Sequence, residues 1–371
     1  MKRKFLIIIT IFILASLLSG CGGAPAASSW PGIVYDPQSQ TIYTAFQSHI
    51  FAIQSSGSMK WRYPEKADTN QQFYSSPVLT TDGQLVASSY ENKVYSLNPA
   101  NGQLNKILLN KDRGRFIDSP LATQDSLYAS SSDEFLYAFD LQGTLRWTFP
   151  DQTKDKQADR EKQALWAKPA EKDGTLYLPS MNRKIYALSA KDGSVIWKQD
   201  LPSASVHSPV LSEDGVLYAG TLANEIVALD TKSNGKLLWS LATKGWVWSA
   251  PAIVDKILYF GDLTGSFYAV DRTNGNILPW ADKPDGINVG SPISGTPLVL
   301  KDKIYFTTQA GNLYVLDMKG NILKTSAVGG KVYGGAVAAG DQILVAPVGI
   351  DNILIAFDLD GNQKWSFAPP K

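Results

Sequence analysis

The sequence has few of the residues that build disulfide frameworks or soft-metal sites: one cysteine and two histidines among 371 residues. A single cysteine cannot form a disulfide within the chain, so no covalent crosslink supports the fold. His49 and His207 lie far apart, and no Cys, His, Asp or Glu cluster has metal-ligand spacing. Ser208 follows His207 but belongs to a repeated Ser-Pro dipeptide. We therefore predict no catalytic residue and no metal.

An excess of charge of either sign is also missing. Lys and Arg number 35 against 34 Asp and Glu, a net charge of +1, and only 19% of residues are charged. An average soluble domain has roughly 25%. A protein that binds nucleic acid normally carries a basic patch or stripe, so we predict no nucleic-acid partner.

No apolar run is long enough to cross a membrane. After Lys2-Arg3-Lys4, the apolar stretch from Phe5 to Leu18 has 14 residues, a rise of about 21 Å in a helix against a hydrocarbon core of roughly 30 Å. Such a stretch is typical of an export signal. We interpret residues 1–20 as a lipoprotein signal peptide and residues 21–29 as a flexible tether.

The signal ends in Leu18-Ser19-Gly20-Cys21, which resembles the bacterial lipobox. That resemblance implies that Cys21 is acylated and becomes the first residue of the mature protein. The alternative is an ordinary cleavage site followed by a stray thiol. Two or more acyl chains anchor a protein stably, so we predict lipid anchoring outside the cytoplasm, on the cell membrane or the outer membrane.

What the sequence does have is a repeat. A strand with a small residue, a turn with glycine and a second strand recur eight times, and the small residues are spaced 44, 42, 49, 41, 41, 46 and 41 residues apart. The small residue is found at these positions: Ala52, Ser96, Ala138, Ala187, Ala228, Ala269, Val315 and Ala356. Periods of roughly 40–50 residues made of short strands indicate a propeller. We predict an all-β fold over residues 30–371, an eight-bladed β-propeller of four-stranded antiparallel blades.

Each unit carries the same signals in order. A Ser-Pro dipeptide or variant precedes the first strand, Leu-Tyr pairs mark the second, and Asp-Gly dipeptides between them (82–83, 173–174 and 214–215) predict two-residue hairpin turns. A tryptophan follows the later glycine by four residues in five units, while units two, six and seven have Lys106, Pro279 and Lys324 there. We expect these five docking tryptophans to pack between blades: Trp61, Trp147, Trp197, Trp239 and Trp365.

The pattern Ala228-Leu229-Asp230, Gly235 and Trp239, with its seven relatives, resembles the docking motif of the PQQ-like propeller repeat family. This family includes quinoprotein dehydrogenases and the BamB-type lipoproteins of the outer-membrane barrel-assembly machine. The well-studied dehydrogenases carry adjacent cysteines and a calcium site, which this chain lacks, so we expect no cofactor. The segment 164–168 also lacks the arginine of the BamB-type partner loop.

One face of such a ring carries the connections that vary in length. From the tryptophan position to the next proline position the spacing runs from 12 to 22 residues, and inserted length on one face is where propellers place binding sites. The longest insertion is 150–168, with Leu165 and Trp166 as candidate apolar anchors. Three residues before the proline position lie the seven mouth residues: Tyr74, Ile117, Trp166, Val206, Trp248, Ser294 and Tyr333.

Tyr74, Trp166, Trp248 and Tyr333 are the aromatic mouth residues, and with Leu165 they are our candidate binding residues. Stacking between blades at the rim is the alternative role for the aromatic rings. We predict a monomeric, lipid-anchored, non-enzymatic scaffold that binds a protein of the cell envelope, BamB-like if the organism has an outer membrane. The alternative is a surface lipoprotein whose propeller binds a ligand, glycan or peptide.

Overall fold

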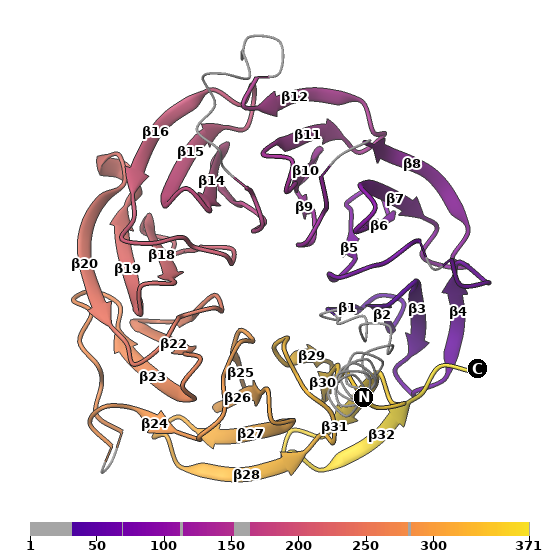
Figure 1. Cartoon of the computed structure of the whole chain (residues 1–371). Helices are drawn as coiled ribbons and strands as arrows, with labels where there is room; N and C mark the ends of the chain where they lie inside the picture. Colours follow the sequence, from indigo (N-terminus) through magenta and orange to yellow (C-terminus); the bar gives the residue numbers. More distant parts are fainter. Residues whose placement is uncertain (1–31, 69, 112–113, 152–163, 281–282, 371) are drawn as a thin grey trace, which may run out of the picture.

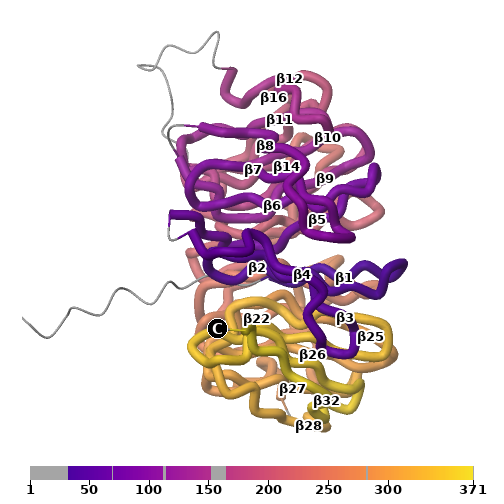
Figure 2. The backbone as a smooth tube through the Cα atoms, turned by 90° about the vertical axis from the view of Figure 1, so that its right-hand side faces the viewer, coloured from indigo at the N-terminus to yellow at the C-terminus, as the bar shows by residue number. Residues whose placement is uncertain are grey.

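The computed structural model describes residues 32–68, 70–111, 114–151, 164–280 and 283–370. Eight four-stranded antiparallel sheets form a closed ring, and each sheet consists of four consecutive strands (Figure 1). The first strand of each blade lies nearest the centre and the fourth forms the rim. Turned by 90°, the ring presents its rim, with the strands of blade 1 toward the viewer (Figure 2). The predicted eight-bladed propeller is confirmed.

The strands of the first four blades have the following bounds. Blade 1 has β1 (Ile33–Asp36), β2 (Thr41–Phe46), β3 (His49–Gln54) and β4 (Met59–Tyr63); blade 2 has β5 (Val78–Leu79), β6 (Leu85–Ser88), β7 (Lys93–Leu97) and β8 (Leu104–Asn110). Blade 3 has β9 (Leu121–Ala122), β10 (Ser126–Ser130), β11 (Leu136–Asp140) and β12 (Leu145–Phe149); blade 4 has β13 (Ala170–Lys172), β14 (Thr175–Ser180), β15 (Lys184–Ser189) and β16 (Val195–Asp200).

The remaining blades follow the same order. Blade 5 has β17 (Val210–Leu211), β18 (Val216–Thr221), β19 (Glu225–Asp230), the short 3₁₀ helix η1 (Thr231–Ser233) and β20 (Lys236–Ala242); blade 6 has β21 (Ala252–Val254), β22 (Ile257–Gly261), β23 (Ser266–Asp271) and β24 (Ile287–Asn288). Blade 7 has β25 (Leu298–Leu300), β26 (Lys303–Thr308), β27 (Asn312–Asp317) and β28 (Ile322–Ala327); blade 8 has β29 (Val337–Ala339), β30 (Gln342–Val345), β31 (Leu354–Phe357) and β32 (Gln363–Phe367). Within the described ranges, no helix has the length and apolarity needed to cross a membrane.

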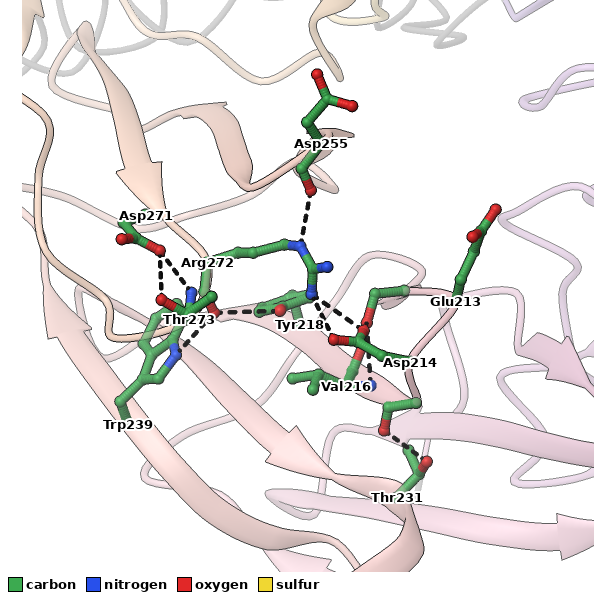
Figure 3. A network of polar contacts seen from close by, with 12 residues as sticks. Glu213, Asp214, Val216, Tyr218, Thr231, Trp239, Asp255, Asp271, Arg272 and Thr273 are labelled. Atoms are coloured by element: carbon green, nitrogen blue, oxygen red, sulfur yellow. Dashed lines mark hydrogen bonds and ion pairs between the residues drawn. The ribbon is translucent and has the colours of Figure 1, made fainter.

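The five docking tryptophans join neighbouring blades, as Trp239 illustrates. Trp239 pairs across strands with Ala228, and its ring lies 5.8 Å from that of Tyr218. The Trp239 Nε1–H and the Tyr218 hydroxyl both donate to the Arg272 carbonyl oxygen in blade 6, at 3.0 and 3.2 Å (Figure 3). In blade 6 Gly275 lies so close that a Cβ there would be 2.7 Å from Trp239 Cε3.

The same arrangement recurs around the ring. Trp61 and Tyr43 share the Pro99 carbonyl oxygen, at 2.9 and 3.1 Å. Trp147 and Tyr128 share that of Ala190, at 3.1 and 3.5 Å. A glycine of the following blade lies against each docking tryptophan: Gly102 on Trp61, Gly193 on Trp147, Gly235 on Trp197, Gly275 on Trp239 and Gly57 on Trp365. Because the repeat supplies both the tryptophan and the glycine, each blade fits the next.

Blade 6 corrects the expectation that unit six lacks a docking tryptophan. Pro279 occupies the expected position, but Trp280, one residue later, takes the role: its ring lies 5.8 Å from that of Tyr259, and Gly320 of blade 7 lies against it. Proline has no N–H to donate to a sheet, and β24 begins only at Ile287. One extra residue therefore moves the indole outside the regular spacing without removing it.

The ring closes between blades 8 and 1 without exchange of strands. Here the second strand carries Leu344 where six of the other blades have tyrosine and blade 2 has Val86, and Gln342 connects the blades instead. Trp365 Nε1–H donates to Gln342 Oε1 at 3.0 Å, and Gln342 Nε2 donates to the Ser55 carbonyl oxygen of blade 1 at 3.1 Å. Ser55 has the repeat position of Arg272, whose carbonyl oxygen accepts directly from a docking tryptophan. At the joint between blades 8 and 1 the Gln342 side-chain amide instead links the tryptophan to that carbonyl oxygen.

The expected two-residue hairpin turns occur at one of the three Asp-Gly sites. Asp173 and Gly174 both have positive φ, 50° and 75°, between the paired residues Lys172 and Thr175. At Asp82-Gly83 and Asp214-Gly215 only the glycine has positive φ. The Thr80 and Ser212 hydroxyls accept backbone N–H bonds from Gln84 and Val216, and this stabilises wider turns.

Candidate functional site

A cavity of about 390 Å³ opens at the mouth of the central channel. All seven mouth residues line it, six half-buried and Ser294 buried. Leu263 and Gln309, from the turns between the second and third strands of blades 6 and 7, also line it. The connections between blades and these turns therefore share one face of the ring, as the four-strand meander predicts.

Hydrogen bonds between neighbouring blades hold the wall of the cavity. Ser119 Oγ donates to the Ser76 carbonyl oxygen at 2.7 Å, which joins blades 2 and 3. The Lys168 N–H donates to Asp118 Oδ2 at 2.9 Å, which joins blades 3 and 4. Ser294 Oγ donates to the Tyr333 carbonyl oxygen at 3.0 Å, which joins blades 7 and 8. Groups positioned in this way form a preformed pocket rather than a loose surface.

Tyr74 makes contacts at the rim of the mouth in addition to lining the cavity. The Tyr74 ring lies 4.6 Å from that of Tyr90, and the Arg115 guanidinium covers the Tyr90 ring at 4.3 Å. The Tyr74 hydroxyl donates to Gln72 Oε1 at 3.1 Å. Tyr74 thus takes part in a stack at the rim, the alternative that the sequence left open, although it still lines the cavity.

Leu165 is corrected as a candidate anchor. Its side chain is fully buried and packs in an apolar cluster with Tyr128, Leu176 and Leu178. A side chain without exposed surface cannot be inserted into a partner. Trp166, the next residue, is half-buried and lines the cavity. Residues 152–163, the centre of the long insertion, lie outside the described residues, as do the signal, Cys21 and the tether.

Three charged or ionisable residues that were not among the candidate binding residues also line the cavity: Asp118, Lys168 and His207. Asp118 accepts the Ser119 N–H at 2.7 Å in addition to that of Lys168. Burial lowers the pKa of His207 from its usual value; Asp118 opposes that effect and the Lys168 charge adds to it. At neutral pH the imidazole is therefore uncharged. Asp118, Lys168 and His207 lie one or two residues before the proline of their repeat unit, and this spacing could have identified them from the sequence.

The lining of the cavity is of the kind that ligand pockets have. Within the described part of the chain no group of three or more His, Cys, Asp or Glu side chains lies close enough to hold a metal ion. The cavity combines aromatic and aliphatic walls with a few polar groups, as ligand pockets commonly do.

Comparison with known proteins agrees with the docking motif. A family model described as outer membrane protein assembly factor BamB matches residues 47–203, 141–232 and 207–334. Together these spans cover more than half of the chain. The chain belongs to this PQQ-like propeller family. No curated protein matches it.

Solved structures share the fold at low identity. BamB from Moraxella catarrhalis has a TM-score of 0.66 and 14% identity, with 87% of this chain and 95% of that chain covered. The computationally designed Ika8 protein has a TM-score of 0.68 and 13% identity, covering 93% and 98%. Saccharomyces cerevisiae Sqt1 has a TM-score of 0.68 and 14% identity, covering 93% and 97%. A fold common to a bacterial, a yeast and a designed protein does not by itself define function.

Proposed function

We propose that the protein is a lipid-anchored, non-enzymatic scaffold of the cell envelope that binds a protein partner through the mouth face of the propeller. Membership of the family described as outer membrane protein assembly factor BamB supports this role. In an organism with an outer membrane, the role would be in outer-membrane protein assembly.

The observation that carries the proposal is that seven equivalent positions of the repeat, different in identity, line one cavity. Positions that build the ring repeat as tryptophan, glycine or tyrosine, whereas the mouth residues range from serine to tryptophan. Buried aromatic side chains at the centre of an interface commonly supply most of its binding energy. Trp166, beside the longest insertion, is the best candidate for such an anchor.

Site-specific crosslinking in the native envelope tests the proposal. A photoreactive phenylalanine at position 166 or 206 should give a discrete crosslinked product with one envelope protein. The same group at exposed Asn274, in a turn on the opposite face, should give none. Equal products from both faces, or none from the mouth, would refute the scaffold role.

Substitution of the same anchor gives a quantitative test. Trp166→Ala should weaken binding of the crosslinked partner roughly 30-fold, because a desolvated aromatic anchor contributes about 2 kcal/mol. Reversing the charges of Lys154 and Lys156, in the long insertion, should do much less, since ion pairs at a protein surface typically contribute about 0–1 kcal/mol. Surface plasmon resonance of the purified pair measures both.

The lipid anchor has its own test. Cys21→Ser should move the protein from the membrane to the soluble fraction once the signal has been removed, because acyl chains supply the membrane affinity. The circular dichroism spectrum should not change. Retention of the variant in washed membranes, with the signal removed, would contradict anchoring through Cys21.

A further inference from the structure

The aromatic mouth residues are arranged regularly around the cavity. Tyr74, Trp166, Trp248 and Tyr333 precede blades 2, 4, 6 and 8, one at every second blade. In an eight-bladed ring this places them about 90° apart. Ile117, Val206 and Ser294 alternate with them, before blades 3, 5 and 7. A ligand in the cavity therefore meets aromatic surface on several sides.

The ionisable groups, in contrast, lie in one sector. Asp118, Lys168 and His207 precede blades 3, 4 and 5 in succession. The lining contributed by blades 6 to 8 is uncharged, with Trp248, Leu263 and Gln309 among its residues. The cavity thus has a side with charged groups and an uncharged side, where Trp248 and Leu263 supply apolar surface beside the polar Ser294 and Gln309. A ligand with both an ionised group and an apolar group matches these two sides.

Within the polar sector Asp118 and Lys168 carry opposite charges, but the Lys168 ammonium is the one that makes no hydrogen bond or ion pair with the described residues. Both carboxylate oxygens of Asp118 accept backbone N–H bonds, from Ser119 and Lys168. Among the described residues no carboxylate lies within ion-pair distance of the half-buried Lys168 ammonium. An ammonium group in a partly desolvated cavity favours an anionic ligand. The neutral His207 beside it supplies hydrogen bonding but no competing charge.

Several buried polar atoms next to the cavity also lack partners. In the described structure His207 Nδ1, Ser208 Oγ and Ser249 Oγ make no hydrogen bond. His207 lines the cavity, and Ser208 and Ser249 directly follow lining residues. Buried polar groups in native proteins are nearly always satisfied, by protein, water or ligand. Ordered water or the polar groups of a ligand could satisfy these three atoms beside the cavity.

We propose that the channel mouth binds a compact apolar group that carries a carboxylate, with the carboxylate at Lys168 and His207 and the apolar group against Trp248 and Leu263. This chemistry has two sources: the end of a protein chain with a large apolar last residue, or a free arylalkanoic acid. The inference rests on the proposed function in that both use the mouth face.

Calorimetric titration of the full-length protein in detergent tests the charge requirement. N-acetylphenylalanine and its neutral amide, N-acetylphenylalaninamide, differ only at the carboxyl group. The acid should bind at one saturable site about tenfold more tightly than the amide. The Lys168→Gln variant should bind the acid no more tightly than the unmodified protein binds the amide. Lys331→Gln, at an exposed lysine that does not line the cavity, should leave both affinities unchanged.

Two further ligands distinguish the sources. A blocked tripeptide with a C-terminal phenylalanine should bind more tightly than 3-phenylpropanoate if a protein end is the natural ligand, and no more tightly if a free acid is. Either order supports the carboxylate site. The proposal is wrong if neither acid binds with a Kd below about 1 mM, if acid and amide bind equally, or if Lys168→Gln changes nothing. Crosslinks from position 166 would survive that failure, so scaffold and ligand site can fail separately.

Discussion

The tryptophans of the rim and those of the mouth show how the repeat divides between architecture and function. At the rim, five indoles have a tyrosine ring 5.8–5.9 Å away, namely those of Trp61, Trp147, Trp197, Trp239 and Trp280. At the mouth, Trp166 and Trp248 line a cavity. Among the described glycines, none has either mouth indole among its nearest neighbours. Tryptophan thus packs between blades at the rim and lines the cavity at the mouth.

This difference gives a rule for reading repeats. A position that keeps its residue in most units serves a contact that every blade must make. A position that keeps its place but varies in residue is free to specify a ligand, even where one of its side chains, such as Ser294, also joins two blades. Substitutions at the rim tryptophans and at the mouth residues test this comparison, because only those at the rim should greatly reduce stability.

The largest effect should follow loss of a rim indole. Trp239→Ala removes the ring stacked on Tyr218 and the hydrogen bond to Arg272, and should lower the free energy of unfolding by about 3–5 kcal/mol. Trp166→Ala should leave the Tm nearly unchanged, because its ring faces the cavity. Differential scanning calorimetry of both variants decides: equal losses would show that Trp166 is a core residue.

A smaller loss should follow from filling the space beside the same indole. Gly275 and Gly83 both have φ of +79°, but a Cβ at Gly275 would lie 2.7 Å from Trp239, whereas one at Gly83 would meet nothing within 4 Å. Each change to alanine has the backbone cost of positive φ, about 1 kcal/mol or more. Gly275→Ala should cost roughly a further 1–2 kcal/mol for overpacking. Equal unfolding midpoints in urea would mean that the blades separate easily to admit the methyl group.

His207, which lines the cavity, should change how the stability of the protein depends on pH. Burial holds the pKa of His207 below 6.5, so the unfolded chain takes up a proton at a higher pH than the native protein. Stability should therefore fall as the pH falls below 6.5, until His207 is protonated in the folded state as well. His207→Gln should show a shallower decline in Tm between pH 7 and 5, since all other groups titrate in both proteins. Parallel curves would exclude His207 as the source.

The smallest effect should come from an exposed ion pair at the rim. Arg272 Nη1 donates to both carboxylate oxygens of Asp214, at 3.0 and 2.9 Å (Figure 3), but the Asp214 side chain is 55% exposed. Arg272→Ala removes this pair and the Nε–H bond to the Asp255 carbonyl oxygen at 2.8 Å, and leaves the carbonyl oxygen that accepts from Trp239. The loss of stability should be about 1–2 kcal/mol. A loss as large as that of Trp239→Ala would mean that the side chain, rather than the carbonyl, joins the blades.

The sequence predicted the fold well because spacing alone carries the information. Eight small residues, one in the third strand of each blade, define the blades. Ala228, for example, pairs with Trp239 in the fourth strand. Trp280 was missed because one inserted residue breaks the Gly-to-Trp spacing, while three-dimensional packing tolerates the shift. Leu165 was misread because apolar character alone does not distinguish a buried side chain from an exposed anchor.

The site was predicted only in part, for a related reason. Counting back from each proline located the seven mouth residues, because the same step of the repeat always reaches the channel. The polar sector of Asp118, Lys168 and His207 depends on contacts between different blades, such as the bond from the Lys168 N–H to Asp118. No periodicity within a single unit encodes that contact.

The glutamine bridge at Gln342 has a mechanical consequence. Seven of the eight joints between blades are also crossed by the polypeptide itself, whereas the joint between blades 8 and 1 has only noncovalent contacts, with Gln342 at its centre. A force applied to the chain ahead of β1 acts first on blade 1, and so loads this joint before any other. The resistance of the propeller to pulling therefore depends on the noncovalent contacts of this one joint: the Gln342 amide, the Trp365 indole beside Gly57, and the apolar cluster that Phe51 and Phe367 share. Under tension the ring should open at this joint into a linear row of blades.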